Sequence, residues 1–237
     1  MNVAIITAAG KGERINQDIP KQFLHIEDKP IIIYTLEVFQ HHPSIDAILV
    51  VCLDGWHEIL WAYSKQYNIS KLRWVVSGGL TGFDSIHNGI MELKKHCADD
   101  DIILVHDGNR PLVSHEMISD GISVCTKFGS AVAAIPCTEV VFKSINGNTI
   151  EEEIPRELLK RTQTPHIFRF GKLYWAHGEA EKQVLKNIAA SCSLMWYLGE
   201  PIYFYQGSEK NIKITLLEDI DVFRALLKLS VRMDFKK

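Results

Sequence analysis

Residues 3–14, VAIITAAGKGER, join a short apolar run to a loop of small residues and two glycines. The run 3–7 is brief and β-rich, which is typical of a buried strand. Gly10 and Gly12 let the following backbone approach a phosphate chain closely and offer N–H donors to it. A strand that leads directly into such a loop predicts a phosphate-binding site in an α/β fold.

Two common phosphate-binding motifs do not fit this loop. The dinucleotide-binding fingerprint requires a third glycine where a helix begins, and Ile15 stands at that position. The P-loop requires Gly-Lys-Ser/Thr, which is absent from the loop. Taken alone, the loop is equally well interpreted as a glycine turn with solvated charges. Its position after a strand favours a nucleotide site of another class.

Short apolar runs alternate with helical patterns along most of the chain. Strands are expected at 3–7, 47–53, 72–76, 101–105, 131–136 and 202–206, and helices at 30–41, 56–67, 84–96, 114–129 and 171–182. A last helix is expected after Thr215-x-x-Glu218, a capping-box signature that follows a short segment at 211–215. This alternation predicts a doubly wound, mostly parallel sheet in a single α/β domain over residues 1–237.

Residues 138–156 interrupt the alternation. The segments 140–144 and 149–154 flank the turn Asn146-Gly147-Asn148 and read as a β-hairpin. The second segment is acidic and offers few residues to a core. We therefore expect an arm that projects from the domain.

Composition excludes several classes of protein. The 237 residues carry a net charge of -3, so no global positive field attracts nucleic acid or an anionic membrane. The five cysteines have no metal-ligand spacing, and their odd count is typical of a reducing compartment. No secretory signal and no membrane-length apolar stretch is evident, so we expect a cytoplasmic protein.

A second polar motif, His106-Asp107-Gly108-Asn109-Arg110-Pro111, follows the expected strand at 101–105. Ligands of open α/β sheets bind beyond the carboxyl ends of strands, and Mg²⁺ is usually held by one or two carboxylates plus substrate phosphates. Asp107 is therefore a candidate Mg²⁺ ligand. The alternative is a turn acceptor that pairs with Arg110.

Together these segments resemble the family of methylerythritol-phosphate and ribitol-phosphate cytidylyltransferases. The family's motifs occur in order from Thr7 to Asp219, as Ala-Ala-Gly-x-Gly-x-Arg, Pro-Lys-Gln-Phe, Gly-Gly…Asp84-Ser85, His-Asp-Gly-x-Arg-Pro, Thr-x-Thr-Pro and Asn-Ile-Lys-Ile-Thr. The resemblance implies a Rossmann-like nucleotidyltransferase fold. It also implies transfer of CMP from CTP to a polyol phosphate with release of pyrophosphate, and Mg²⁺ as cofactor.

The resemblance implies roles for individual residues. CTP would contact two segments, formed by Thr7, Ala8, Ala9, Gly10 and Gly12 and by Gly79, Gly82, Asp84 and Ser85. The catalytic cations would be Arg14, Lys21, Arg156 and Lys213, and the acceptor would contact Asp107, Arg110 and Thr164. In the family, Arg156 enters the neighbouring subunit's site from the arm at 138–156, which implies a homodimer.

The chain departs from the family at several positions. Gly82 stands where the family often has Arg, and Glu139-Val140 replaces Asp-Thr. Ala189-Ala190-Ser191 replaces the Thr-Asp-Asp/Glu of the methylerythritol enzymes. Loss of hydroxyl and carboxylate groups on the acceptor side predicts a different polyol, such as ribitol 5-phosphate. His166, often Gln in the family, is interpreted as a loop histidine without a role.

Three alternatives remain open from the sequence. The chain could be a 2-C-methyl-D-erythritol 4-phosphate cytidylyltransferase of isoprenoid synthesis, although the altered acceptor residues oppose this. A sugar-1-phosphate nucleotidyltransferase would share only the first glycine loop. A catalytically weak nucleotide-binding paralogue would not need Arg14, Lys21, Asp107 and Lys213 together.

Overall fold

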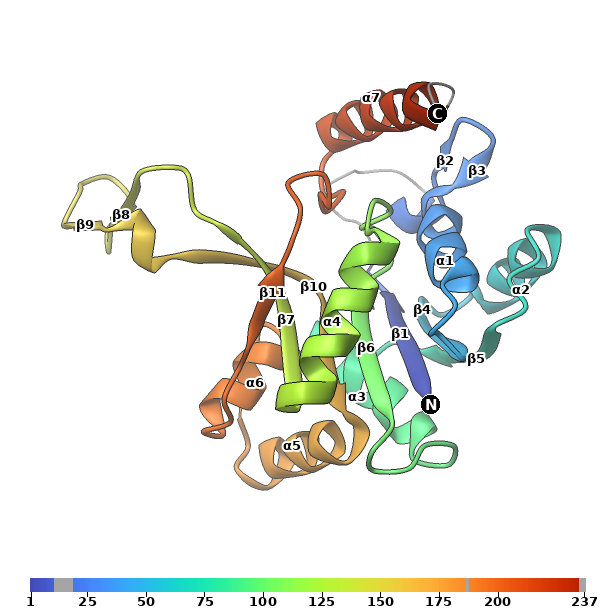
Figure 1. Ribbon diagram of the computed structural model, residues 1–237, viewed down its shortest axis with the longest axis horizontal. Coiled ribbons are helices and arrows are strands. Elements are labelled where there is room, and N and C mark those ends of the chain that lie inside the picture. Colours follow the sequence, from blue (N-terminus) through green and yellow to red (C-terminus); the bar gives the residue numbers. More distant parts are fainter. Residues whose placement is uncertain (11–18, 186–187, 235–237) are drawn as a thin grey trace.

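The fold is built on a seven-stranded sheet with the order β11-β7-β10-β6-β1-β4-β5 (Figure 1). The computed structural model describes residues 1–10, 19–185 and 188–234, with side chains described up to residue 229. The strands of the sheet are β1 (Asn2–Ala8), β4 (Ala47–Cys52), β5 (Leu72–Ser77), β6 (Ile102–Asp107), β7 (Ser130–Pro136), β10 (Lys160–Arg169) and β11 (Phe204–Gln206). Only β10 runs antiparallel to its neighbours among these strands. The predicted doubly wound, mostly parallel sheet is confirmed.

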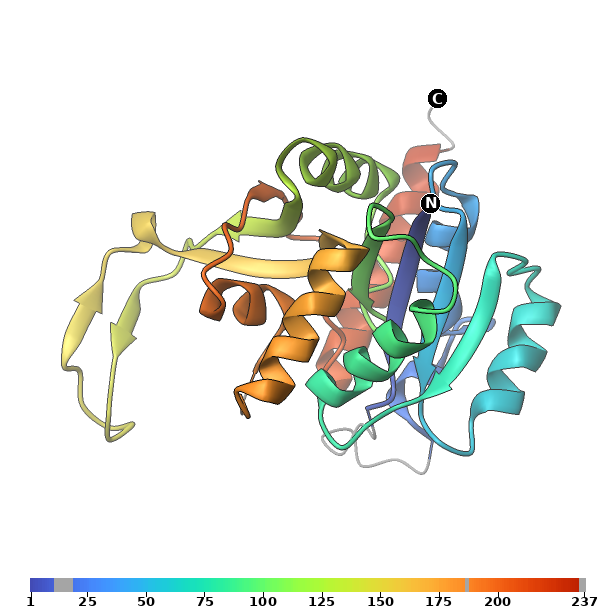
Figure 2. The same ribbon diagram turned by 90° about the horizontal axis from the view of Figure 1, so that it is seen from below.

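Helices cover both faces of the sheet (Figure 2). One layer contains α1 (Ile31–His41), α2 (His57–Gln66) and α4 (His115–Phe128), and the other contains α3 (Gly82–Leu93), α5 (Phe170–Lys182) and α6 (Ser191–Tyr197). Alternate residues of β1 separate into the two cores, with Ala4 and Ile6 facing the first layer and Val3 and Ile5 the second. Such alternation across a strand places apolar side chains on both faces of a buried sheet.

The C-terminal helix α7 (Leu217–Asp234) forms a separate apolar cluster with the small hairpin of β2 (His25–Ile26) and β3 (Lys29–Pro30). The start of α7 is held by Asp219, whose Oδ2 accepts hydrogen bonds from the Thr215 N–H at 2.7 Å and the Leu216 N–H at 2.8 Å. The predicted capping partner Glu218 was therefore wrong by one residue. The segment before α7 forms no strand and instead crosses the end of β6.

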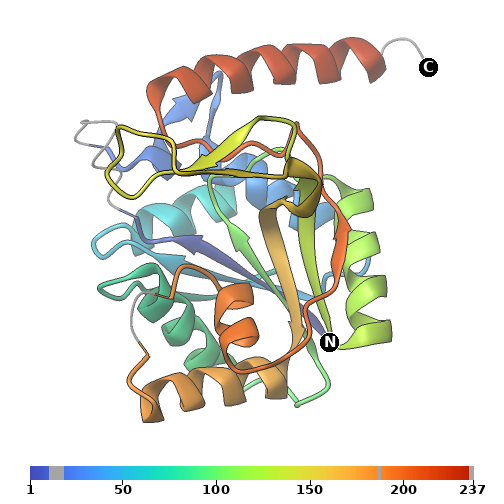
Figure 3. The same ribbon diagram turned by 90° about the vertical axis from the view of Figure 1, so that its left-hand side faces the viewer.

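The arm leaves the domain between β7 and β10 (Figures 1 and 3). Its strands β8 (Val141–Lys143) and β9 (Glu152–Ile154) pair antiparallel, as predicted for the hairpin, and the short helix η3 (Arg156–Leu158) follows. Large apolar side chains are exposed on the arm, namely Val140, Phe142, Ile145 and Ile150, and Leu158 of η3 is exposed as well. The arm thus has little apolar cover from its own chain.

The short elements η2 (Lys21–Phe23), β2, β3 and η3 were not predicted, and neither were the longer β10 and α6. β10 begins with the polar residues Lys160–Gln163, so its first half lacks the apolar alternation that identifies a strand. α6 is only 7 residues long, which is too short for a helical period to stand out. Most other elements differ from the predicted ranges by one or two residues at their ends. In the described part of the chain, no helix is long and apolar enough to cross a membrane.

Candidate active site

Two adjoining pockets open beyond the carboxyl ends of β1 and β6. The large pocket has a volume of about 540 Å³, and its walls include the loop after β1, Lys21 and the start of α3. The small pocket has a volume of about 180 Å³ and lies between β6, β10 and the start of α6. Thr7, Asp107 and Lys213 line both pockets. These three residues therefore mark the boundary at which two ligands would meet.

The loop after β1 forms one wall of the large pocket. Thr7, Ala8, Ala9 and Gly10 line it, as the sequence predicted for a nucleotide. Gln22 is 2% exposed, and its Nε2 donates to the carbonyl oxygens of Ala8 at 2.7 Å and Gly10 at 3.1 Å. These two hydrogen bonds hold the backbone of the loop in place. Gly12 and Arg14 lie outside the described residues.

The opposite wall comes from the loop that leads into α3. A Cβ at Gly78 would collide with Ala9, and one at Gly79 would collide with Asp84, so both glycines are required for the close packing. Ser85 Oγ accepts from the Gly79 N–H at 3.0 Å and donates to the Thr81 carbonyl at 2.9 Å. The loop is therefore shaped by its own side chains.

Three of the four residues predicted to bind cytidine line the large pocket, namely Gly79, Gly82 and Ser85. The fourth, Asp84, caps α3, because its Oδ2 accepts from the Thr81 N–H and hydroxyl, both at 2.9 Å. A Cβ at Gly82 would meet nothing within 4 Å, so this position leaves the pocket open.

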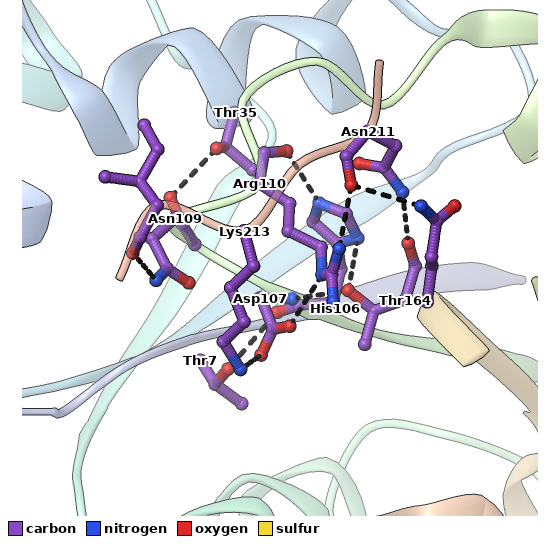
Figure 4. A network of polar contacts seen from close by, with 12 residues as sticks. Thr7, Thr35, His106, Asp107, Asn109, Arg110, Thr164, Asn211 and Lys213 are labelled. Carbon is purple, nitrogen blue, oxygen red and sulfur yellow. Dashed lines mark hydrogen bonds and ion pairs between the residues drawn. The ribbon is translucent and has the colours of Figure 1, made fainter. Parts of the chain in front are cut away.

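Asp107 stands at the boundary of the pockets and holds two cations (Figure 4). Lys213 Nζ lies 3.0 Å from Oδ1, and Arg110 Nε lies 2.9 Å from Oδ2. Burial by itself would raise the pKa of this carboxyl, but Lys213 and Arg110 outweigh burial and hold the pKa well below its usual range. Asp107 is therefore ionised, and the ion pair with Arg110 considered from the sequence is present.

A buried chain of hydrogen bonds orients the Asp107 backbone. The Asp107 N–H donates to Thr164 Oγ1 at 3.1 Å, and Thr164 Oγ1 lies 3.0 Å from His106 Nδ1. Burial lowers the pKa of His106 to about 4, so the ring is neutral. Its Nε2–H donates to the Arg110 carbonyl at 3.1 Å, which leaves Nδ1 to accept from the Thr164 hydroxyl. Thr164 thus lines the small pocket, but its hydroxyl is already bonded to the Asp107 N–H and to His106 Nδ1.

The segment that carries Lys213 is attached to the end of β6 and to β10. The Ile214 N–H donates to the Asn109 carbonyl at 2.9 Å, and the Asn109 side chain donates back to the Ile214 carbonyl. Arg110 Nη1 donates to the Asn211 carbonyl at 2.7 Å, and Asn211 Nδ2 donates to the Thr164 carbonyl at 2.9 Å. These bonds fix the position of Lys213 beside Asp107.

The small pocket is bordered by the positions at which the chain departs from the methylerythritol enzymes. Ala189, Ala190 and Ser191 line it, together with His166. His166 belongs to β10 and is 5% exposed, so its interpretation as a loop histidine was wrong. Burial lowers the pKa of His166 to about 4, and the ring is neutral. The other altered pair, Glu139-Val140, is exposed on the arm.

Two predicted site residues of the described part, Asp84 and Arg156, line neither pocket. Arg156 is exposed at the base of the arm, where its Nη1 donates to the Thr138 carbonyl at 3.0 Å and its Nε lies 3.5 Å from Glu157. It lines neither pocket in the described part of the chain. The other predicted cations that the structure describes, Lys21, Arg110 and Lys213, line the pockets, whereas Arg14 lies outside the described residues.

Several residues of the site were missed from the sequence. Gln22, His106, Asn109 and Asn211 all stabilise the loops that carry the predicted groups. Each lies inside a motif that the sequence singled out, so their presence beside Lys21, Asp107 and Lys213 was the available signal. The bonds of Asn109 to Ile214, of Asn211 to Thr164 and of His106 to Thr164 join distant parts of the chain, and local sequence patterns do not reveal such pairs.

The described residues contain no group of three or more His, Cys, Asp or Glu side chains that could hold a metal ion. Asp107 is the carboxylate at the boundary of the two pockets. Since Mg²⁺ often uses one protein carboxylate together with substrate phosphates and water, Asp107 fits a substrate-dependent metal site.

Residues 2–229 match the family model described as "IspD: 2-C-methyl-D-erythritol 4-phosphate cytidylyltransferase". A "Ribitol-5-phosphate cytidylyltransferase" of Lacticaseibacillus paracasei is 41% identical over 230 residues, with 96% of this chain and 98% of the relative covered. A "2-C-methyl-D-erythritol 4-phosphate cytidylyltransferase" of Clostridium tetani is 38% identical, with 92% and 87% covered. The crystal structure of the Francisella tularensis 2-C-methyl-D-erythritol 4-phosphate cytidylyltransferase is 29% identical and superposes with a TM-score of 0.77, covering 93% of this chain and 97% of that one.

Proposed function

Because the chain belongs to the IspD family of 2-C-methyl-D-erythritol 4-phosphate cytidylyltransferases, it is a CTP-dependent cytidylyltransferase, and we propose that its acceptor is ribitol 5-phosphate. The observation that carries this proposal is the pair of adjoining pockets with a common boundary at Thr7, Asp107 and Lys213. The large pocket is suited to CTP and the small one to a polyol phosphate. Their reacting phosphates would meet at the boundary.

In the proposed reaction, a phosphate oxygen of the acceptor forms a bond to the α-phosphorus of CTP. The bond between that phosphorus and the bridging oxygen to the β-phosphate breaks, and pyrophosphate leaves with the electron pair. The second pKa of a phosphomonoester is about 6, so the attacking oxygen is already deprotonated at neutral pH. The reaction therefore needs no general base, and positioning and charge stabilisation remain for the protein.

Cations at the boundary are suited to this task. Lys213 lines both pockets and Lys21 lines the large one. Lys213 and Arg110 both contact the Asp107 carboxylate, and the three side chains together carry one net positive charge. We assign Lys213 to the acceptor phosphate and Lys21 to the triphosphate, where each offsets the repulsion between two anionic substrates.

The small pocket supports ribitol 5-phosphate as the acceptor. Ala189, Ala190 and Ser191 line this pocket, and they lack the carboxylates that the methylerythritol enzymes carry at these positions. A site that recognises hydroxyls is selective because unmatched polar groups lose their partners. Loss of those carboxylates favours a different polyol chain, and the Lacticaseibacillus paracasei relative is named for ribitol 5-phosphate.

Mg²⁺ would be held by Asp107 and by phosphate oxygens of the substrates. The ion would neutralise charge on the triphosphate when bound. Asp107 would keep Lys213 and Arg110 in place in the same arrangement.

A homodimer would bring Arg156 to the site. The arm exposes Val140, Phe142, Ile145 and Ile150, and an isolated two-stranded hairpin is marginal in water. A second copy of the chain is the partner that would cover both arms symmetrically. Arg156, which lies outside the pockets of its own chain, would then enter the site of the partner.

Initial-rate measurement of pyrophosphate release tests the proposed function. The wild-type protein is supplied with Mg²⁺ and each of CTP, UTP, ATP and GTP, and with ribitol 5-phosphate, 2-C-methyl-D-erythritol 4-phosphate or glycerol 3-phosphate. We expect release with CTP and ribitol 5-phosphate above all other pairs. Preference for the methylerythritol substrate would overturn the acceptor assignment, and no release with any pair would favour an inactive paralogue.

A further inference from the structure

We propose that the His166 imidazole hydrogen-bonds a hydroxyl group of the acceptor polyol and thereby determines which acceptor is used. The inference rests on the proposed function and names a specificity-determining residue for it. No contact between His166 and the reacting phosphates is required.

The strand register places His166 on the same face of the sheet as Asp107. His166 pairs with Val105 across β10 and β6, and Val105 pairs with Ile5 across β6 and β1. Directly paired residues project to the same face, as do residues two apart in one strand. Asp107 and Thr7 are the next residues of this face, and all of these except Ile5 line the small pocket. His166 therefore lies one step farther from the boundary than Asp107.

The separation between His166 and the boundary of the pockets fits the length of the acceptor's carbon chain. Its phosphate would lie at the boundary, beside Lys213, because that is where it attacks CTP. Its carbon chain would then extend into the small pocket, toward His166. Diagonal neighbours in a sheet have Cα atoms roughly 7–8 Å apart, a separation that a polyol of several carbons can span. His166 would thus meet a hydroxyl and not the phosphate.

The hydrogen-bonding capacity of His166 is unused by the described part of the chain. Both nitrogens of the neighbouring His106 are bonded, to Thr164 and to the Arg110 carbonyl. The His166 side chain, 5% exposed, has no hydrogen bond to any described residue, although a buried polar group without a partner is costly. Its ring nitrogens are not sealed into the core, unlike those of His177, and the ring lines the small pocket.

The chemistry of a neutral imidazole matches a hydroxyl. It has one donor and one acceptor, as a hydroxyl does. The nearby charged groups are already paired with one another, since Asp107 binds both Lys213 and Arg110. Val105, Ala189 and Ala190 line the pocket with apolar side chains. Of the polar residues beside them, Ser191 has a fully buried Oγ, and the Gln163 side chain is already bonded to the Ser208 backbone. His166 is therefore the polar side chain best placed to recognise the polyol.

The test compares kcat/KM for ribitol 5-phosphate with kcat/KM for its four monodeoxy analogues. The proteins are the wild type, His166→Phe, which keeps a ring without polar atoms, and His166→Gln, which keeps a donor and an acceptor. We expect the wild type to disfavour one analogue on the order of 10- to 100-fold through this contact. His166→Phe should lose that discrimination, and His166→Gln should retain part of it.

His177→Phe is the matched control. His177 is also a buried histidine without a hydrogen bond, but it stacks on Phe83 and lines neither pocket. This variant should keep the wild-type discrimination. Calorimetric titration with CTP reports whether the large pocket of His166→Phe is intact. If His166→Phe no longer binds CTP, the comparison of wild type with His166→Gln is used as the test instead.

An equal fall in kcat/KM for all five acceptors, or unchanged discrimination in the His166 variants, would overturn this inference alone. The proposed function fails separately if the wild-type protein does not use ribitol 5-phosphate, and the inference then fails with it.

Discussion

Lys213 Nζ lies 3.0 Å from Asp107 Oδ1, although the two residues are 106 positions apart in the chain. The other carboxylate oxygen binds Arg110 Nε at 2.9 Å. Two cations are thus gathered around one carboxylate at the boundary of the two pockets. Since both substrates of the reaction are anions, this is the place where positive charge contributes most to catalysis.

Lys213→Met should lower kcat/KM for the acceptor by about 10²–10³-fold, the scale for loss of one preorganised charge-stabilising group. The change also removes one of the two cations that hold the pKa of Asp107 low. Initial rates at varied acceptor concentration measure the effect. Lys210→Met, at an exposed position in the same segment, is the control and should keep wild-type rates. Normal turnover by Lys213→Met would show that the ion pair is only structural.

Lys21→Ala should lower kcat by roughly 10²–10³-fold with a much smaller loss of CTP affinity. The side chain lines the large pocket, and its charge is expected to act on the triphosphate mainly in the transition state. Turnover assays and calorimetric titration with CTP separate the two effects. Lys65→Ala, on the exposed surface of α2, is the control. Near-normal turnover by Lys21→Ala would show that the charge of Lys21 has no catalytic role.

His177→Phe should make folding stability less dependent on pH. Burial lowers the pKa of His177 to about 3, whereas the unfolded side chain protonates near pH 6.5. Between these values the unfolded state binds more protons, so the free energy of unfolding falls as the pH is lowered. The variant lacks this contribution of at most about 1.4 kcal/mol per pH unit.

Urea unfolding at pH 7 and pH 5 measures this difference. The loss of stability between the two pH values should be smaller in His177→Phe than in the wild type. At pH 7 the variant should be at least as stable, because an apolar ring replaces one whose buried nitrogens have no partner among the described residues. His41→Phe, at the exposed end of α1, controls for the substitution itself. Parallel losses in His177→Phe and the wild type would contradict the assignment.

Mixing Arg156→Ala subunits with Lys21→Ala subunits should restore part of the activity. If each arm enters the partner's site, a dimer of one Arg156→Ala subunit and one Lys21→Ala subunit has one site with both a wild-type Lys21 and a wild-type Arg156. Arg156 lies outside both pockets of its own chain, so the effect depends on the partner. Activity is measured after the two variants are mixed and re-equilibrated. The proposal that Arg156 acts in the partner's site would be contradicted if the mixture stays as inactive as the separate variants, or if the protein is monomeric at assay concentration.

Much of the fold could be predicted because its strands are buried on both faces. β1, β4 and β6 are nearly continuous apolar runs, and Ser114 and Gly129 mark the ends of α4 as expected. β10 was not predicted because its first half, Lys160–Gln163, is polar and mostly exposed. Its pairing with β6 and β7 depends on contacts between distant segments, which local patterns do not encode.

In the site, too, residues within local motifs could be predicted, whereas roles that depend on contacts between distant segments could not. The motifs identified the pocket residues Gly79, Ser85 and Lys213, since phosphate and base recognition require particular residue types close together. His166 was misjudged because its importance comes from burial beside Asp107, which follows from the strand register and not from its neighbours in the chain. The role of Asp84 in the capping box of α3, whose N-cap is Thr81, was missed even though Thr81-x-x-Asp84 matches the capping-box pattern.

The central claim is tested most directly by competition between two acceptors in one reaction. The wild-type protein, Mg²⁺ and CTP are mixed with equal concentrations of ribitol 5-phosphate and 2-C-methyl-D-erythritol 4-phosphate, and mass spectrometry measures both cytidine diphosphate products at early times. The product ratio equals the ratio of the two kcat/KM values. We predict that the ribitol product predominates by at least about 10²-fold, the scale for a site matched to the hydroxyls of one acceptor. Equal amounts of the two products, or an excess of the methylerythritol product, would contradict the account.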